Sequence, residues 1–188
     1  MQSEYLLDTN AFFNILQAMS PDSINHNALS DSVKKLLSEK LYISTITKVE
    51  IISVLGKYAR GNSGGFQKCN CIISKEGHVC QHNRYIAPRP KWSNRRIKIW
   101  LKFIEEIFNG QSPFLEVEAE PFNAETILEA QKIIQHALIH NFASMDAFLA
   151  ATAKIARDHK REVTVITSDK GLKACLGKCN IPYRDIFV

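Results

Sequence analysis

Residues 5–16, with the sequence YLLDTNAFFNIL, decide the fold of this chain. The short apolar run at 5–7 is typical of a β-strand, and it ends at Asp8. Thr9 can cap a helix, and the apolar residues of 11–16 follow it directly. We therefore predict a strand that leads straight into a helix, which is the building unit of α/β domains.

The same alternation of short strands and helices continues along the chain. Further strands are predicted at 41–44, 115–119 and 163–167, and helices at about 31–37, 46–59, 93–109, 123–138, 144–158 and 171–176. The buried side of the helix at 46–59 is formed either by Val49, Ile52 and Leu55 or by Ile51 and Leu55. The apolar run at 163–167 is typical of a buried parallel strand. This order predicts a three-layer α/β fold with a central parallel sheet.

Length and composition indicate a single domain over residues 1–188, with a basic hairpin and helix segment inserted at about 61–90. The chain has 188 residues, of which 45% are hydrophobic and 23% charged. It can therefore form its own core, and it lacks the composition of a disordered protein. We expect no membrane span and no signal peptide, and hence a cytoplasmic protein. The five cysteines are an odd number, which favours thiols or metal ligands over a disulfide framework.

Positive charge is concentrated in one segment of the chain. Residues 57–102 hold eleven Lys and Arg side chains but one acid, Glu76, whereas the rest of the chain has 13 basic and 18 acidic residues. This segregation is typical of a protein that binds a polyanion, because Lys and Arg neutralise phosphates and release counterions. A solvated surface run is the alternative interpretation. The side chains predicted to bind RNA are Arg84, Arg89, Lys91, Arg95 and Arg96.

Aromatic residues lie among these basic side chains. Tyr85, Trp92 and Trp100 could stack on nucleic-acid bases. The helical spacing of Trp100 with its apolar neighbours instead favours a place in the core.

Four acidic residues occupy positions that suggest a site. Asp8 and Asp169 follow predicted strands, at the edge where open α/β sheets bind ligands. Glu50 lies among apolar neighbours, which is unfavourable for a carboxylate unless a cation or water meets it. Asp146 lies in the first turn of the helix at 144–158.

Each of these acids also has a structural interpretation. Asp146 could stabilise a helix N-terminus, Asp169 could cap the short helix after it, and Asp8 could be a turn residue. Together, however, two strand ends and two helix starts would bring the acids to one rim of the sheet. Because like charges repel, we expect a hard divalent cation there.

Four segments carry a resemblance to a known family: LLDTN at 6–10, STITKVE at 44–50, SMDAFLAATA at 144–153 and ITSD at 166–169. In this order they resemble the PIN domains, which are metal-dependent ribonucleases, and especially the toxin members of the VapC kind. The resemblance implies that an acidic cluster binds Mg²⁺ or Mn²⁺ and is catalytic, with its members being Asp8, Glu50, Asp146 and Asp169. It also implies that Thr9, Asn10 and Thr167 line the site. The insertion at about 61–90 departs from a small toxin.

The resemblance also implies an activity and partners. It implies an endoribonuclease that hydrolyses single-stranded or looped RNA and leaves a 5′-phosphate and a 3′-hydroxyl. Asp8 and Asp146 are assigned to direct metal coordination, Glu50 to a second ligand or to water orientation, and Asp169 to a weaker second metal position. A toxin of this kind has a small antitoxin partner and forms a homodimer. The alternatives are an RNA-processing nuclease without an antitoxin, and a catalytically silent RNA-binding module with a structural zinc hairpin.

The inserted segment also suggests a zinc site. A hairpin that turns between Lys75 and Glu76 pairs Cys71 with Cys80 and Cys69 with His82. These four side chains would then share one face of the hairpin and could bind Zn²⁺. The Cys-x-Cys spacing is tight for zinc, and Gly77 could shift the register by one residue. His78 as a rival ligand and a polar hairpin without metal remain the alternatives.

Overall fold

The structure is a computed structural model that describes residues 3–19, 31–68, 83–113 and 115–185. The chain divides into two compact units. The first, here called the sheet unit, comprises Met1–Ile51 and Phe103–Val188, and the second, here called the basic unit, comprises Ile52–Lys102. The expectation of a single domain with an insertion at about 61–90 stays a prediction.

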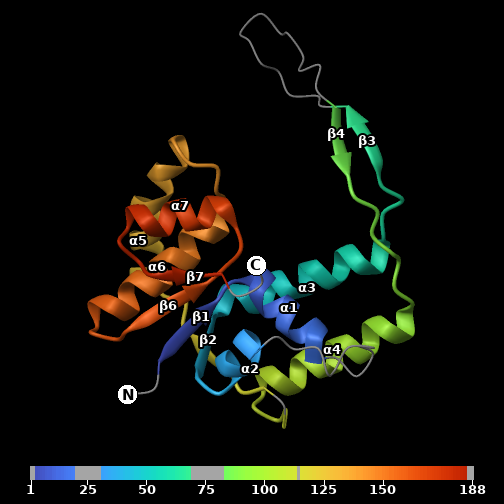
Figure 1. The fold of residues 1–188 in the computed structure, drawn as a ribbon, viewed down its shortest axis with the longest axis horizontal. Coiled ribbons are helices and arrows are strands. Elements are labelled where there is room, and N and C mark those ends of the chain that lie inside the picture. Colours follow the sequence, from blue (N-terminus) through green and yellow to red (C-terminus); the bar gives the residue numbers. More distant parts are fainter. Residues whose placement is uncertain (1–2, 20–30, 69–82, 114, 186–188) are drawn as a thin grey trace, which may run out of the picture. The chain divides into compact units, whose positions relative to one another are not determined.

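The sheet unit is built on five parallel strands in the order β5-β2-β1-β6-β7 (Figure 1). Their bounds are β1 (Glu4–Leu7), β2 (Lys40–Ser44), β5 (Glu118–Glu120), β6 (Val163–Ile166) and β7 (Tyr183–Arg184). In the central strand, Leu7 pairs with Ile43 of β2 and with Ile166 of β6. The chain extends the sheet from β1 to one side through β2 and to the other side through β6. The order of the strands therefore reverses at β1, which is the switch point where such sheets bind ligands.

Helices connect the strands and confirm the α/β class with a parallel sheet. The helices of the described residues are α1 (Thr9–Met19), α2 (Asp31–Leu37), α3 (Thr45–Arg60), α4 (Asn94–Phe108), α5 (Ala124–Ile133), η1 (Ile134–Leu138), α6 (Ser144–Asp158) and α7 (Lys170–Lys178). No helix among these residues is long and apolar enough to cross a membrane.

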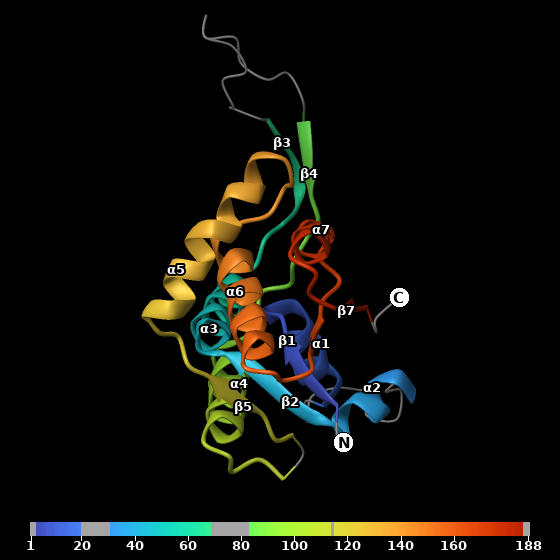
Figure 2. The same ribbon diagram turned by 90° about the vertical axis from the view of Figure 1, so that its left-hand side faces the viewer.

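The two faces of the sheet bury alternate side chains of β1. Leu6 belongs to a cluster formed by α5, α6, α7 and the sheet, in which Ala147 and Ala150 are completely buried. These small residues let α6 lie close to the strands. Leu7 is also fully buried but lies outside that cluster, because successive side chains of a strand point to opposite faces. Figure 2 shows α6 and α1 on opposite sides of β1.

Several elements differ from the sequence prediction at their ends. The strand predicted at 115–119 is β5, which begins at Glu118, and β7 was not predicted. The helix predicted to reach residue 138 ends at Ile133 and continues as a 3₁₀ turn in which Leu138 is 91% exposed. Helix α3 buries Ile51 and Leu55 and exposes Val49 and Ile52, which decides between the two faces that the pattern allowed.

The basic unit contains a two-stranded antiparallel ribbon. Strand β3 (Gly65–Lys68) pairs with β4 (Asn83–Ile86), with Lys68 opposite Asn83. This register is the one that continues into the predicted pairing of the zinc hairpin. Its proposed ligands Cys69, Cys71, Cys80 and His82, and the rival His78, lie outside the described residues. The zinc site stays a prediction.

Stacked aromatic rings form the base of this ribbon. The ring of Trp92 lies 4.4 Å from that of Tyr58 and 5.0 Å from that of Trp100. The guanidinium of Arg96 lies over Trp92 at 4.2 Å, and that of Arg89 over Tyr58 at 5.4 Å. Trp92 and Trp100 are only 5% and 2% exposed. The core position of Trp100 is thereby confirmed, and the interpretation of Trp92 as a base-stacking residue is wrong.

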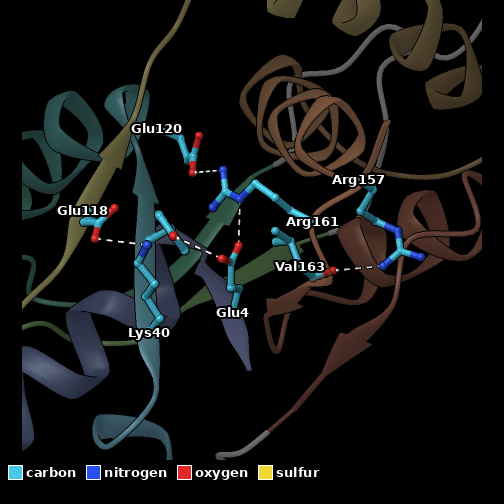
Figure 3. Close-up of polar contacts among 8 residues, drawn as sticks. Glu4, Lys40, Glu118, Glu120, Arg157, Arg161 and Val163 are labelled. Carbon is cyan, nitrogen blue, oxygen red and sulfur yellow. Dashed lines mark hydrogen bonds and ion pairs between the residues drawn. The ribbon is translucent and has the colours of Figure 1, made fainter. Parts of the chain in front are cut away.

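Ion pairs compensate the acids near the amino ends of β1 and β6. Arg161 donates from Nε to Glu4 at 2.7 Å and from Nη1 to Glu120 at 2.5 Å (Figure 3). Its guanidinium also lies over the ring of Tyr42. Lys40 pairs with Glu118 at 3.3 Å. Arg161 thus connects β1, β2 and β5 through one planar group, which a lysine could not reproduce.

We expect Arg161→Met to lower the free energy of unfolding by about 2 kcal/mol, because two half-buried carboxylates lose their counter-charge. Arg161→Lys should recover less than half of this loss, since one ammonium cannot bridge both acids and stack on Tyr42. Urea denaturation at low ionic strength measures both. Lys132→Met is the matched control, because Lys132 is exposed and its partner Glu129 keeps an ion pair with Lys154, so little stability should be lost. Equal losses in the Arg161→Met and Lys132→Met variants would contradict the prediction.

Candidate active site

Asp8 lies where β1, β6 and α1 meet. Its Oδ1 accepts a hydrogen bond from the backbone N–H of Ala11, and its Oδ2 accepts one from the hydroxyl of Thr167. Its own backbone N–H donates to the carbonyl of Ile166 at 3.1 Å. Asp8, and not the predicted Thr9, therefore caps α1, and the residue is only 4% exposed.

Thr167 and Asp169 follow β6 and continue this network. The Thr167 hydroxyl, which is buried, accepts a hydrogen bond from the backbone N–H of Asp169 at 3.0 Å. Asp169 in turn caps α7, because its Oδ1 accepts from the N–H of Leu172 at 2.8 Å. One buried hydroxyl thus links the carboxylate of Asp8 to the start of the next helix.

Glu50 reaches the same region from α3. The hydroxyl of Thr9, the first residue of α1, donates to Oε2 of Glu50. This contact joins residues that are 41 positions apart in the sequence. Asn10, which is predicted to line the site, follows Thr9 in α1 and is exposed.

Asp146 comes from α6, in whose first turn it lies as predicted. Its Oδ2 accepts a hydrogen bond from the backbone N–H of Ala143 at 2.8 Å. The side chain is half-buried. The three aspartates Asp8, Asp146 and Asp169 therefore each accept a hydrogen bond at the N-terminus of a helix. This confirms the structural interpretations of Asp146 and Asp169, whereas Asp8 caps α1 and is not a turn residue.

The capping contacts leave carboxylate oxygens available. Oδ1 of Asp146, Oδ2 of Asp169 and Oε1 of Glu50 have no hydrogen-bond partner in the part of the chain that the structure describes. None of the four acids forms an ion pair there. The helix N-termini offset part of the negative charge, but no Lys or Arg side chain of the described residues pairs with these acids. Glu4 and Glu120, by contrast, each form an ion pair with Arg161.

The pKa values of two of these aspartates, Asp8 and Asp146, are raised in the folded protein. Burial raises the pKa of Asp8 to about 6, against the hydrogen bonds from Thr167 and Ala11, and the charges of Asp146 and Asp169 raise it further. Burial also raises the pKa of Asp146, and the charges of Asp169 and Glu50 add to the shift. The four acids therefore interact electrostatically, as like charges at one rim of the sheet do.

The donor set fits a hard divalent cation. Carboxylate oxygens are the ligands that Mg²⁺ and Mn²⁺ prefer. A bound cation would favour the charged carboxylates, against the burial and the like charges that raise these pKa values. Among the described residues, however, no group of three or more His, Cys, Asp or Glu side chains is already arranged to hold a metal ion. The assignment of the four acids as metal ligands stays a prediction.

A further acid lies near this edge that the sequence interpretation missed. Asp185 directly follows β7, accepts a hydrogen bond from the hydroxyl of Ser168 at 2.7 Å and forms an ion pair with Lys173. Lys173 compensates its charge, which distinguishes it from the four acids above. The rule that ligands bind beyond the carboxyl ends of strands would have pointed to Asp185, but β7 has only two residues and gives no pattern of its own.

Gly171 sets how closely the segment before α6 approaches α7. A Cβ at this position would lie 1.9 Å from the backbone oxygen of Asn141 and 3.2 Å from Oδ1 of Asp169. Asn141 lies two residues before Ala143, whose N–H holds Asp146. Only glycine lets the backbone that leads to Asp146 approach the helix start that carries Asp169.

Fold and site together define a three-layer α/β protein with an uncompensated acidic site at the switch point of a parallel sheet. The PIN domain family matches residues 5–175. The chain therefore belongs to the PIN domain family, whose members are nucleases.

The solved structure of FitAcB supports the fold. FitAcB from Neisseria gonorrhoeae is 17% identical, and the match covers 95% of this chain and 95% of that chain with a TM-score of 0.52. VapBC2 from Rickettsia felis, bound to a DNA fragment from their promoter, is 16% identical over 97% of this chain and 98% of that chain, with a TM-score of 0.49. A comparison with curated proteins finds no match.

We expect Asp8→Asn to stabilise the metal-free protein at pH 8. The pKa of Asp8 is raised from 3.8 to about 6 by folding, so its contribution to stability is fully present below pH 3.8 and is lost as the pH rises through 6. A shift of this size corresponds to about 3 kcal/mol at pH 8 and to about half of that at pH 5. Denaturation in EDTA at the two pH values tests this.

The matched control for this measurement is Asp158→Asn at the other end of α6. Asp158 pairs with Lys154 and is exposed, so its replacement should change the free energy of unfolding by less than about 1 kcal/mol. A variant Asp8→Asn that is less stable than the wild type at pH 8 would contradict the prediction.

We expect Gly171→Ala to lower the free energy of unfolding by about 1–3 kcal/mol, because the backbone of Asn141 must move. Mn²⁺ affinity should fall as well, since Asp146 moves with this segment. Gly177→Ala in the same helix is the control: nothing lies within 4 Å of a Cβ there, and alanine should be neutral or stabilising by up to about 1 kcal/mol. If both variants were equally stable, Gly171 would not have the spacing role described here.

Proposed function

We propose that this PIN domain protein is an endoribonuclease that hydrolyses RNA phosphodiester bonds and requires Mg²⁺ or Mn²⁺. The proposal is carried by the four carboxylates at the carboxyl edge of the sheet, which interact with one another and lack ion pairs in the described part of the chain. Membership in a family of nucleases supports it. The concentration of positive charge in the basic unit supports a nucleic acid as the substrate.

The four acids differ in how the fold holds them, which suggests different roles. Asp8 is the most constrained, because both of its oxygens accept hydrogen bonds within the network. We assign Asp8 and Asp146 to direct metal binding. Glu50, oriented by Thr9, would be a further ligand or would orient the attacking water. Asp169 would contribute to a weaker second metal position.

The chemistry proposed at this site is attack of water on the phosphorus. When bound, Mg²⁺ or Mn²⁺ lowers the pKa of water and offsets the negative charge that develops on the phosphate oxygens. The 3′ oxygen of the upstream nucleotide leaves and is protonated, so the products carry a 3′-hydroxyl and a 5′-phosphate. Thr167 and Ala11 hold Asp8 in place, and Ala143 holds Asp146, so that these carboxylates need no reorganisation during the reaction.

The basic unit would bind the RNA. Lys91 and Arg95 are exposed and suited to contact phosphates. The guanidinium groups of Arg89 and Arg96 lie over aromatic rings within the unit, so we assign them first to the rigidity of its base. Arg84 belongs to β4, and its side chain lies outside the described part.

The resemblance to toxin members of the family extends the proposal to partners. FitAcB and VapBC2 are proteins of similar fold. We propose that a small antitoxin protein restrains this nuclease and that it forms a homodimer. A short reading frame next to its own that rescues growth when co-expressed would support the toxin role. Its absence would favour an RNA-processing nuclease.

Cleavage of an end-labelled structured RNA by the purified protein tests the proposed activity. We expect cleavage with Mg²⁺ or Mn²⁺ and none with EDTA. Asp8→Asn and Asp146→Asn should each lower the rate by roughly 100-fold or more, because each removes a ligand of the cation that stabilises the transition state. Asp158→Asn, at the far end of α6, should cleave at the rate of the wild type.

Other outcomes would contradict parts of this proposal. Cleavage that persists in EDTA would exclude metal dependence. If the wild type and both variants bind RNA equally and none cleaves it, the protein is a catalytically silent RNA-binding module. Zinc that survives dialysis would then support the predicted hairpin site.

A further inference from the structure

Two aromatic side chains face the solvent on the ribbon of the basic unit. Phe66 of β3 is directly opposite Tyr85 of β4. Phe66 is 78% exposed and Tyr85 is 59% exposed. Their ring centroids are 5.4 Å apart and their planes are inclined at 60°. They form an edge-to-face pair of the kind that aromatic rings prefer.

This exposure sets the pair apart from the other aromatic residues of the unit. Trp92 and Trp100 are buried in the ring stack with Tyr58, so the unit has an interior for such side chains. Opposed aromatic residues stabilise a two-stranded ribbon by at most about 1 kcal/mol. A stabilisation of this size does not explain why most of the Phe66 ring is exposed to water. Two half-exposed β-branched residues would stabilise the ribbon equally well.

The base of the ribbon holds the pair in a fixed frame. The backbones of Asn62 and Arg89 exchange two hydrogen bonds of 2.8 Å. Gly64 has a φ of 75° and approaches Pro88 so closely that a Cβ would lie 2.8 Å from its nitrogen. Because these contacts anchor both strands immediately before β3 and after β4, the two rings are presented on a pre-organised support.

The charge of the basic unit indicates the chemistry of the ligand. The described residues of the basic unit, 52–68 and 83–102, contain no Asp or Glu. Exposed Lys91, Arg95 and Lys98 belong to the same unit. A nucleic acid fits both features, because it combines negatively charged phosphates with bases that have flat apolar faces.

We propose that Phe66 and Tyr85 form a stacking platform for unpaired bases of RNA, separate from the acidic site. The platform rests on the proposed function, because it assigns RNA as the substrate. Bases within a duplex are already stacked, so the platform selects single-stranded segments and loops. Phosphate contacts from the Lys and Arg side chains of the basic unit would contribute affinity without this selectivity.

Binding measurements in EDTA, which prevents cleavage, test the platform. The probes are a fluorescent ten-nucleotide oligouridine and a duplex RNA of 16 base pairs. We expect Phe66→Ala/Tyr85→Ala to weaken binding of the single strand by roughly 10-fold to 100-fold, as loss of base stacking does. Duplex affinity should change by less than about twofold, and the dependence of single-strand affinity on salt should keep its slope.

Two further variants act as controls. Phe66→Tyr/Tyr85→Phe keeps both rings and should bind the single strand like the wild type. Lys91→Ala/Arg95→Ala removes two phosphate contacts, so it should weaken both RNAs and lower the salt slope by roughly 1 to 2.

The failure of the platform and the failure of the proposed function are distinguishable. If the alanine pair binds the single strand like the wild type while the Lys91/Arg95 variant is weakened, the platform is wrong and RNA binding stands. Equal weakening for single strand and duplex would also overturn it. If the wild type binds neither RNA, the RNA substrate itself is wrong. If RNA binding is unchanged but the alanine pair alters the mass in light scattering, the rings form an interface between copies.

Discussion

The buried carboxylate of Asp8 is the constraint on which the rest of the sheet unit depends. Asp8 follows the central strand β1 and caps α1 by accepting a hydrogen bond from the N–H of Ala11. Its other oxygen accepts a hydrogen bond from the hydroxyl of Thr167, which follows β6. Removing a carboxylate from water is unfavourable, and burial accordingly raises its pKa to about 6. The other acids at this edge, Glu50, Asp146 and Asp169, add only negative charge. Positive charge from outside the described residues is therefore needed to keep the Asp8 carboxylate ionised.

The treatment of charge differs sharply between two regions of the same sheet. Arg161, which precedes β6, is shared by Glu4 at the start of β1 and Glu120 at the end of β5, so these two acids stabilise the protein (Figure 3). At the carboxyl edge, four acids interact without a cation in the described part of the chain. A site of this kind sacrifices stability for function. Glu4 and Glu120 show, for comparison, how the same sheet pairs carboxylates that have a structural role.

In the basic unit, aromatic and cationic side chains divide into a buried and an exposed set. Arg89 and Arg96 cover the rings of Tyr58 and Trp92 and rigidify the base of the ribbon. Phe66 and Tyr85 remain in solvent on the ribbon itself. The sequence showed the excess of positive charge, but it did not single out Phe66, because only the pairing of β3 with β4 places that ring against Tyr85.

The sequence by itself determined the α/β class, the parallel sheet, most helices and the four acids, because hydrophobic periodicity and residues at strand ends are local signals. It left the register of the inserted hairpin open. Only the tertiary structure decided that Asp8 is the cap of α1, that Thr9 contacts Glu50, that Lys173 compensates Asp185 and that Gly171 must lack a side chain. These facts depend on residues that are distant in the chain and on burial, which shifts a pKa in ways that no local pattern encodes.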